Sequence, residues 1–491
     1  MKELLKKLRG IDAGMLCIPA LMLLGYIFIH MLFGGTLLSY NCWDSYSLQA
    51  MSWLSGRLDM GKNYEWLELA VYNGKYYLSF PPLPSVVMLP LVLLFGERTP
   101  SNLVSALYGI FTAMIACKIL KKQKVIAIDC EFIREKTFFP IPCLIQVGYE
   151  DGAFLIDPLA ENMDFGDFFA LLQNKKVLKV FHSGRQDIEI LYNLSGAVPT
   201  PVFDTQIAAQ ACGLGECVSY ENLVRAYCGV ELDKSCRLTN WQLRPLSAEQ
   251  LEYAAGDVTH LIKCYNEIAT YLKENKRESW IAEEMEDFAD TAHYEQNPEN
   301  AWLRIRHNGH SLSFLNALKA LAEWREKMAI ERNVSRQNII KDETLVNIAT
   351  AFPKDMEEMK RVRGVRPDVA KSRLAKEMTE ILASLTEDKF DRTLGRVDRE
   401  RDVTLPPSQH SLCEVLKLLL KIKSNDCGVV SRLITSEKNL REYIKNPKAK
   451  NQILKGWRYE VFGKTAEEFR KGKLGIVYDA ASRDIVIKEL S

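Results

Sequence analysis

The fold is decided by the stretch Val125-Ile126-Ala127-Ile128-Asp129-Cys130-Glu131-Phe132. Its apolar beginning is typical of a buried β-strand, and two acids, Asp129 and Glu131, stand near its end. Side chains at positions i and i+2 of a strand point to the same face of the sheet. The two carboxylates are therefore expected side by side, where their charges repel each other unless a cation binds between them.

An acid pair of this spacing is weak evidence on its own. The chain has 63 acidic residues among 491, so about eight acid-x-acid pairs are expected by chance. The pair points to a site only if further acids stand at helix and strand positions from which they can meet it.

Two further acids stand at such positions. Residues 177–181 are predicted to form a strand, and Asp187 falls in the first turn of the helix predicted after it. A capping box begins another helix, predicted over 247–273. Tyr253 and Asp257 are four residues apart in this helix and so lie on one of its faces. Four carboxylates at the ends of elements can thus converge.

Converging carboxylates predict a site for hard metal ions. Four acids offer only oxygen ligands, namely Asp129, Glu131, Asp187 and Asp257. The sequence contains no Cys-x2-Cys pair of zinc-site spacing, so Mg²⁺ or Mn²⁺ is favoured over zinc. Two such ions about 3.5–4 Å apart can clamp the attacking and leaving oxygens of a phosphodiester. Tyr253, a phenol with an ordinary pKa of about 10, is expected to orient the attacking water rather than to be the main base.

Strands come first in this part of the chain, and helices follow. Residues 144–147 and 153–156 are predicted to form two more strands around a turn. The fold class predicted is an α/β domain with a mixed sheet, followed by two all-helical modules of similar length. The predicted boundaries are 1–122 for a membrane segment, 123–290 for the α/β domain, and 310–388 and 406–491 for the two helical modules. Charged linkers are expected at 275–310, with some helix, and at 387–402.

Residues 1–122 differ in character from the rest. Apolar runs at 14–35 and 102–120 have basic residues at their outer ends, which predicts two membrane helices with both chain ends in the cytoplasm. A third apolar run, 86–95, is short and contains Pro90, so it is expected at the membrane interface or as a re-entrant segment.

The overall charge leaves the partner open. The chain has 64 basic and 63 acidic residues and a net charge of +1, and a basic stripe can lie within a neutral total.

The five site positions, Asp129-x-Glu131, Asp187 and Tyr253-x3-Asp257, resemble those of the DEDD exonucleases of the tyrosine subtype. The flanking sequence is similar to bacterial ribonuclease D over 131–140, 143–146 and 241–246. The resemblance implies a ribonuclease-H-like sheet, two divalent ions held by the four acids, and removal of nucleotides from the 3′ end of RNA, notably transfer-RNA precursors. The exonuclease part is expected in the cytoplasm, anchored to the membrane if the N-terminal segment is genuinely part of the protein. Nothing in the sequence indicates an obligate protein partner.

The helical modules resemble the paired HRDC domains that follow the nuclease in that family. The similar segments are Leu321-Ala322-Glu323-Trp324-Arg325-Glu326 and Gly456-Trp457-Arg458-Tyr459. Such modules are expected to hold nucleic acid through phosphate contacts. The candidates are Arg361, Arg363, Arg366 and Lys455, each of which is equally well explained as part of a solvated helix face.

The N-terminal segment resembles the start of a polytopic glycosyltransferase of the C type, at 43–46, 72–77 and 81–84. In that family an acid after the first membrane helix is catalytic, and Asp44 stands at the matching place. Two alternatives to a ribonuclease therefore remain open. One is a DNA-directed 3′-to-5′ exonuclease with the same metal chemistry, and the other is a membrane glycosyltransferase fragment fused to an exonuclease near 116–123.

Overall fold

The computed structural model describes residues 23–28, 31, 38, 44–80, 82–104, 106–107, 123–160, 164–233, 235–401, 405–448, 450–481 and 483–490. They divide into two compact units. The first comprises 1–123 with 160–171, and the second comprises 124–159 with 172–491. Each unit is described by itself.

The N-terminal unit is built on two helices, α3 (Ser45–Leu54) and α4 (Leu83–Phe95), and a hairpin of β1 (Leu69–Tyr72) and β2 (Lys75–Leu78). The short turn η1 (Gly96–Arg98) follows α4. Ala50 of α3 packs against Met88 and Val92 of α4. The carboxylate of Asp44 accepts hydrogen bonds from the backbone N–H groups of Tyr46 and Ser47 and so caps α3. In this structure Asp44 is a helix cap.

No helix among the described residues is long and apolar enough to cross a membrane. The predicted spans at 14–35 and 102–120 lie largely outside the described residues, so the structure gives them no support. The run at 86–95 falls within α4, whose 13 residues are fewer than the roughly 20 that a spanning helix needs.

The second unit contains a five-stranded mixed sheet with the order β5-β4-β3-β6-β7. The strands are β3 (Val125–Ile133), β4 (Ile141–Tyr149), β5 (Gly152–Ile156), β6 (Leu178–Phe181) and β7 (Val202–Asp204). The first three form antiparallel pairs, and β6 and β7 continue the sheet in parallel with β3. The predicted mixed sheet is confirmed, although β7 was not predicted.

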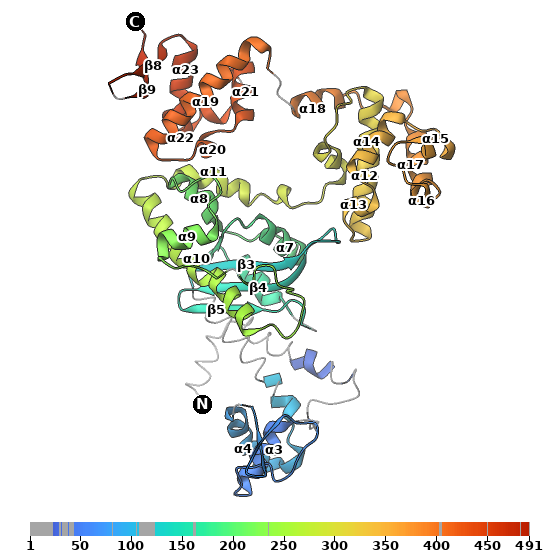
Figure 1. The fold of residues 1–491 in the computed structure, drawn as a ribbon, viewed down its shortest axis with the longest axis vertical. Helices are drawn as coiled ribbons and strands as arrows, with labels where there is room; N and C mark the ends of the chain where they lie inside the picture. The colour runs from blue at the N-terminus through green and yellow to red at the C-terminus, as the bar shows by residue number, and fades with distance from the viewer. Residues whose placement is uncertain are drawn as a thin grey trace, which may run out of the picture. The chain divides into compact units, whose positions relative to one another are not determined.

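The long helix α10 (Ala248–Glu274) packs across β3, β4 and β5 (Figure 1). Ser247 caps it with a complete capping box, as predicted. The contact is close because β4 has a glycine there. A Cβ atom on Gly148 would lie 2.6 Å from the carbonyl oxygen of Val258. Gly148 therefore sets how near α10 comes to the sheet at the residue that follows Asp257.

The remaining helices of the α/β domain are α7 (Arg185–Ser195), α8 (Thr205–Ala211), α9 (Tyr220–Cys228) and α11 (Glu278–Phe288). The helix α6 (Gly166–Leu172) falls almost entirely in the segment 160–171, which belongs to the first unit. The segment 275–310, expected to be a charged linker, contains α11 and the turns η2 (Thr291–His293) and η3 (Pro298–Arg304). Its apolar residues Ile281, Phe288 and Trp302 are buried. The expected helix is therefore present, and three buried apolar side chains pack the segment against its neighbours.

The first helical module begins with α12 (Leu312–Glu331). It continues with α13 (Arg336–Ile339), α14 (Asp342–Ala351), α15 (Met356–Arg361), α16 (Pro367–Ala370) and α17 (Arg373–Ser384). The predicted linker at 387–402 contains the turn η4 (Glu387–Lys389) and the helix α18 (Leu394–Arg401). Leu394 of α18 belongs to the buried core of this module, so that part of the linker prediction is wrong.

Phe138, from the β3–β4 connection, anchors this module to the α/β domain. Its side chain is 2% exposed and packs with Met328 and Ala329 of α12 and with Ile339 of α13. The guanidinium of Arg336 lies 4.4 Å from the centre of the Phe138 ring, a favourable cation–π contact. An aromatic residue of the nuclease sequence is therefore part of the hydrophobic core of the module.

The second helical module comprises α19 (Pro407–Cys427), α20 (Ser431–Ile434), α21 (Glu437–Lys445), η5 (Gln452–Leu454), α22 (Gly456–Arg458), η6 (Tyr459–Gly463) and α23 (Lys464–Arg470). It ends in an antiparallel hairpin of β8 (Leu474–Asp479) and β9 (Asp484–Glu489). The prediction of an all-helical module is therefore wrong at its C-terminal end. Each run contains consecutive β-branched residues, Ile476-Val477 in β8 and Ile485-Val486-Ile487 in β9, which favour strands.

Arg458 fastens this second module to α11. Its guanidinium is 2% exposed and forms ion pairs of 2.5 Å with Glu283 and with Glu284. Beside it, the rings of Trp280 and Trp457 stack 4.5 Å apart. The Trp-Arg pair at 457–458 thus belongs to α22, whereas the similar pair at 324–325 belongs to α12, the opening helix of its module.

Candidate functional site

The acid pair of β3 faces α10, as its spacing predicted. Asp129 is paired across the sheet with Gln146, and Glu131 with Leu144. From the other side α10 supplies Asp257. One carboxylate oxygen from each of these three acids lies within 4.8 Å of the others. The structure therefore brings together a strand pair and a helix residue that are separated by more than a hundred positions in the chain.

Asp187 joins the site from α7 and is buried in the first turn of that helix, where the sequence placed it. It does not belong to the group of three whose oxygens lie within 4.8 Å. Its charge acts on Asp129 and on Glu131, and its carboxylate accepts a hydrogen bond from the backbone of Cys130. Asp187 thus stands beside Asp129 and the backbone of Cys130.

The pKa values of the four acids are all raised, because burial and mutual repulsion disfavour their charged forms. Burial raises the pKa of Asp129 to about 6. Burial and then the Asp129 charge raise the pKa of Glu131 to about 9 and that of Asp257 to about 8. For Asp187 the same two causes, in the same order, raise the pKa well above its ordinary value. The cluster therefore holds more negative charge than its surroundings stabilise.

Tyr253 lies one helical turn before Asp257 and is hydrogen-bonded to it. Burial, and then the Asp257 charge, raise the pKa of this phenol further above its ordinary value. Its ring packs against Trp241, with 6.0 Å between ring centres. Tyr253 is therefore a neutral hydrogen-bond donor held at the edge of the carboxylate cluster.

The donor set fits divalent cations of the Mg²⁺ or Mn²⁺ type. All the ligands on offer are carboxylate oxygens, and a divalent cation between them would offset the mutual repulsion that contributes to their raised pKa values. Gln146 is fully buried opposite Asp129, and both polar atoms of its amide lack a hydrogen-bond partner among the described residues. A buried amide of this kind suits the water that Mg²⁺ usually retains.

The four predicted nucleic-acid contacts are spread over two modules. Arg361 ends α15, Arg363 lies in the turn after it, and Arg366 precedes α16, where it pairs with Asp368 at 2.9 Å. All three are exposed. Lys455 is exposed at the start of α22 in the second helical module. Three of the four thus share one surface segment, and Lys455 belongs to another.

The turn before Asp187 depends on Asp204, which sequence reasoning missed. Asp204 is 1% exposed at the end of β7. One of its oxygens accepts from the N–H of Gly184 at 2.8 Å, and the other caps α8. The signal was present in the sequence, because an Asp-Thr pair after an apolar run is typical of a helix N-cap.

His182 lies in the same turn and fixes it to neighbouring elements. Its Nε2 atom is 3.1 Å from the carbonyl oxygen of Val218, and its Nδ1 atom is 2.9 Å from the hydroxyl of Thr205. Burial lowers the pKa of His182 to about 4, so the ring is neutral in the folded protein at pH 6.

Acidification is expected to destabilise the folded protein through His182. In the unfolded chain the His182 ring takes up a proton below about pH 6.5, whereas in the folded protein it does so only below about pH 4. The stability that depends on His182 is therefore complete above pH 6.5 and is lost as the pH falls through this window, by on the order of 2–3 kcal/mol. The measurement is the free energy of urea unfolding at pH 7 and at pH 4.5.

The matched control for this prediction is His182→Gln, which keeps a polar side chain but cannot titrate. The site acids, whose pKa values are raised, gain stability as the pH falls in both proteins. The change in stability from pH 7 to pH 4.5 should therefore be less favourable in the wild type than in His182→Gln. Equal changes in the two proteins would contradict the role assigned to His182.

Comparison with known proteins gives consistent matches. A family model described as 3′-5′ exonuclease matches residues 107–273, and one described as HRDC domain matches 314–382. Ribonuclease D of Sphingobium indicum is 41% identical over 363 residues, which are 73% of this chain and 92% of that protein. Ribonuclease D of Zymomonas mobilis is 39% identical over 364 residues, which are 74% and 93% of the two chains.

One of the similar solved structures is that of Escherichia coli RNase D, an exoribonuclease involved in structured RNA processing. It superposes with a TM-score of 0.61 at 25% sequence identity, and the match covers 73% of this chain and 96% of that one.

Proposed function

Because the chain belongs to the ribonuclease D family, we propose that its cluster of four acids holds two divalent ions and that these residues hydrolyse RNA. The chain is a 3′-to-5′ exoribonuclease. What is proposed here is which residues carry the reaction and which RNA they act on. The observation that supports the assignment is the meeting of three carboxylates within 4.8 Å.

The four acids are proposed to hold the ions from two positions. Asp129, Glu131 and Asp257 form the inner group, with Asp129 as the residue that all the others face. Asp187, beside Asp129, completes the ligand set from α7. When bound, divalent ions would lower the pKa of the attacking water and offset the charge that develops on the phosphate. The residues themselves position the 3′-terminal phosphodiester and exclude bulk water from it.

Tyr253 is proposed to orient the attacking water. Its hydroxyl is neutral because the pKa of the phenol is raised, so it donates a hydrogen bond and does not act as the base. Its bond to Asp257 fixes the direction of the hydroxyl relative to the cluster. A water held from this side would be aligned with the bond to be broken, which is a positioning effect.

The substrate is proposed to be the 3′ end of a transfer-RNA precursor, held by two HRDC-type modules. The first module is supported by the family match at 314–382. The second is supported by its opening elements. Helices of 21, 4 and 9 residues in α19, α20 and α21 correspond to helices of 20, 4 and 10 residues in α12, α13 and α14. The exposed basic residues Arg361, Arg363, Arg366 and Lys455 are proposed as phosphate contacts.

The test is degradation of a 5′-labelled transfer-RNA precursor with a 3′ extension by the full-length protein in Mg²⁺. A ladder of products that shorten from the 3′ end is expected, and EDTA should stop the reaction. DNA of the same sequence tests the alternative of a DNA-directed exonuclease. Internal cleavage, or equal rates on RNA and DNA, would contradict the proposed substrate.

A further inference from the structure

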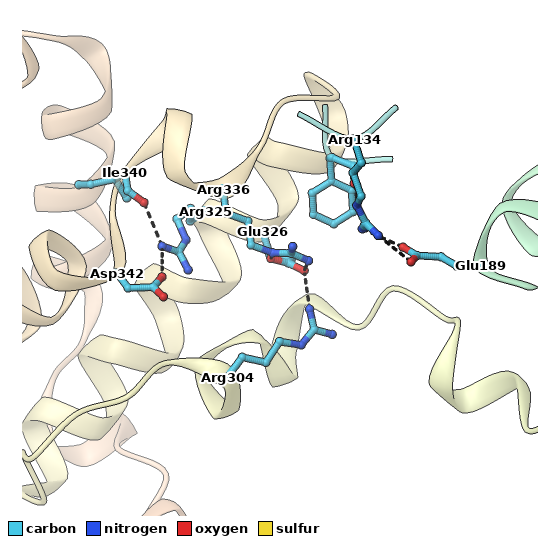
Figure 2. A network of polar contacts seen from close by, with 9 residues as sticks. Arg134, Glu189, Arg304, Arg325, Glu326, Arg336, Ile340 and Asp342 are labelled. Atoms are coloured by element: carbon cyan, nitrogen blue, oxygen red, sulfur yellow. Dashed lines mark hydrogen bonds and ion pairs between the residues drawn. The ribbon is translucent and has the colours of Figure 1, made fainter. Parts of the chain in front are cut away.

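A cleft of about 350 Å³ lies where the β3–β4 connection meets the first helical module. Four of its lining residues are arginines, namely Arg134, Arg304, Arg325 and Arg336. They come from the connection, from the end of η3, and from α12 and α13. In Figure 2, Arg304 and Arg336 meet at Glu326, whereas Arg134 reaches toward Glu189 and Arg325 toward Asp342. The proposed function assigns no role to this cleft.

The arginines outnumber the acids that pair with them. Arg134 forms a two-pronged contact with Glu189, and Arg325 pairs with Asp342 at 2.6 Å. Arg304 and Arg336 share a single acid, Glu326, which is 1% exposed (Figure 2). Four positive charges therefore face three negative ones, and the surplus lies at the shared carboxylate.

Arg304 is the arginine with the most hydrogen-bonding capacity left for a ligand. Its only ion pair among the described residues is the contact of 3.3 Å with Glu326, and its side chain is 56% exposed. A guanidinium has five N–H donors in a planar fork, and one of them is engaged here. Arg336 is less available, because it binds Glu326 through two atoms and also lies over the ring of Phe138.

Two buried polar atoms at the cleft also lack partners. The hydroxyl of Thr137 and the Nε atom of Arg325 make no hydrogen bond within the described part of the chain. Both residues line the cleft. Buried polar atoms are nearly always satisfied in native proteins, so two exceptions beside surplus positive charge indicate a missing acceptor. A domain contact with only a structural role would need neither a surplus of arginines nor buried polar atoms without partners.

We propose that this cleft binds a phosphate group of the RNA backbone upstream of the nucleotide that is being removed. An arginine fork matches the oxygens of a phosphate, and the volume greatly exceeds the roughly 30 Å³ that one water occupies in the liquid. The inference rests on the proposed function, because it takes the RNA 3′ end to lie at the carboxylate cluster.

The position of the cleft along the chain supports this ligand. Arg134 comes three residues after Glu131 and directly follows β3. At about 3.3 Å per strand residue, the two backbone positions are roughly 10 Å apart. An RNA strand whose 3′ end enters the cluster therefore has further phosphates within reach of the cleft. A phosphate bound there holds the strand without reading its sequence.

The test compares Arg304→Gln with Arg306→Gln in the full-length protein. Arg306 lies two positions after Arg304, is exposed and does not line the cleft. Its replacement removes the same charge from the protein without changing the cleft. Binding to a 3′-tailed RNA, with EDTA present to stop hydrolysis, should weaken about tenfold in Arg304→Gln. The slope of log affinity against log salt should fall by about 0.7. Arg306→Gln should bind like the wild type.

Single phosphates of the RNA are then replaced by uncharged methylphosphonates. One position should weaken binding to the wild type and leave Arg304→Gln unaffected, which identifies the phosphate in the cleft. Hydrolysis of a dinucleotide, too short to reach the cleft, should proceed at the wild-type rate in Arg304→Gln. If Arg304→Gln binds RNA like the wild type, or if every methylphosphonate weakens both proteins equally, the proposal is overturned.

Inorganic phosphate distinguishes a free anion from the RNA backbone. If phosphate raises the Tm of the wild type but not of Arg304→Gln, while both bind RNA equally, the cleft takes a free anion and the RNA assignment is wrong. A wild type that fails to degrade RNA in Mg²⁺ would instead contradict the proposed function. The binding measurements in EDTA would still decide the question of the cleft.

Discussion

Asp129→Asn is expected to lower the rate of RNA hydrolysis by on the order of a thousandfold or more and, at the same time, to stabilise the metal-free protein. The charge of Asp129 acts on every other acid of the site, so its loss removes one proposed metal ligand and a charge that raises the pKa of its neighbours. The two effects have one cause, which is the concentration of negative charge that the site requires.

The direction of the stability change follows from the raised pKa values. The folded protein keeps protons on these acids up to about pH 6 for Asp129 and about pH 9 for Glu131, whereas the unfolded chain releases them near pH 4. Stability from the cluster is therefore lost as the pH rises through this range. At pH 8 in EDTA, Asp129→Asn should be more stable than the wild type by on the order of 2 kcal/mol.

The measurement is thermal unfolding at pH 8 with EDTA and with Mn²⁺, alongside single-turnover hydrolysis of RNA. Mn²⁺ should raise the Tm of the wild type and have less effect on Asp129→Asn. Asp44→Asn is the matched control, because it removes an aspartate that caps a helix outside this site and asparagine caps equally well. If Asp129→Asn hydrolyses RNA at the wild-type rate, the site has been assigned to the wrong residues.

Gly148→Val is expected to reduce hydrolysis about a hundredfold without removing any site residue. The added side chain would start 2.6 Å from the carbonyl oxygen and 2.7 Å from the Cβ atom of Val258. Backbone cannot be displaced cheaply, so α10 must move away from β4 by about 1 Å and take Asp257 with it. A displacement of about that size at a catalytic group costs roughly a hundredfold in rate.

Gly152→Ala is the control for this second result. Gly152 lies in the neighbouring strand, and a Cβ atom there would meet only the end of the Tyr149 side chain, at 3.3 Å. The Gly152→Ala variant should therefore retain wild-type activity. The kcat of Gly148→Val should fall while its circular dichroism spectrum stays that of a folded protein. A fully active Gly148→Val would show that α10 tolerates the shift and that the spacing does not position Asp257.

Local spacing was enough to predict the acids of the site. The alternation of a strand places Asp129 beside Glu131, and the turn of a helix places Tyr253 beside Asp257. Both relations hold within a single element, so they can be predicted before the fold is known. The position of Asp187 in a first helical turn was predicted for the same reason.

The residues that were missed depend on pairing between elements. Gln146 faces the site only because β4 pairs with β3 in one register, and Gly148 matters only because α10 crosses β4 there. Asp204 supports Asp187 through β7, which lies next to β6 in the sheet. Arg134 and Arg336 are about two hundred positions apart in the sequence, and no periodicity connects them. Such relations are set by tertiary contacts.

The burial of Phe138 has a consequence for how the protein is made. Its neighbour Phe139 bonds to a residue 194 positions later in the chain, and Phe138 itself is buried by α12 and α13. At 5–20 residues per second, a ribosome needs roughly 10–40 s to synthesise that interval. From the synthesis of Asp257 to the end of this interval, the nascent nuclease carries all four site acids but exposes two adjacent phenylalanines beside the strand that holds Asp129 and Glu131. A chain terminated in that interval would be a substrate for chaperones and proteases.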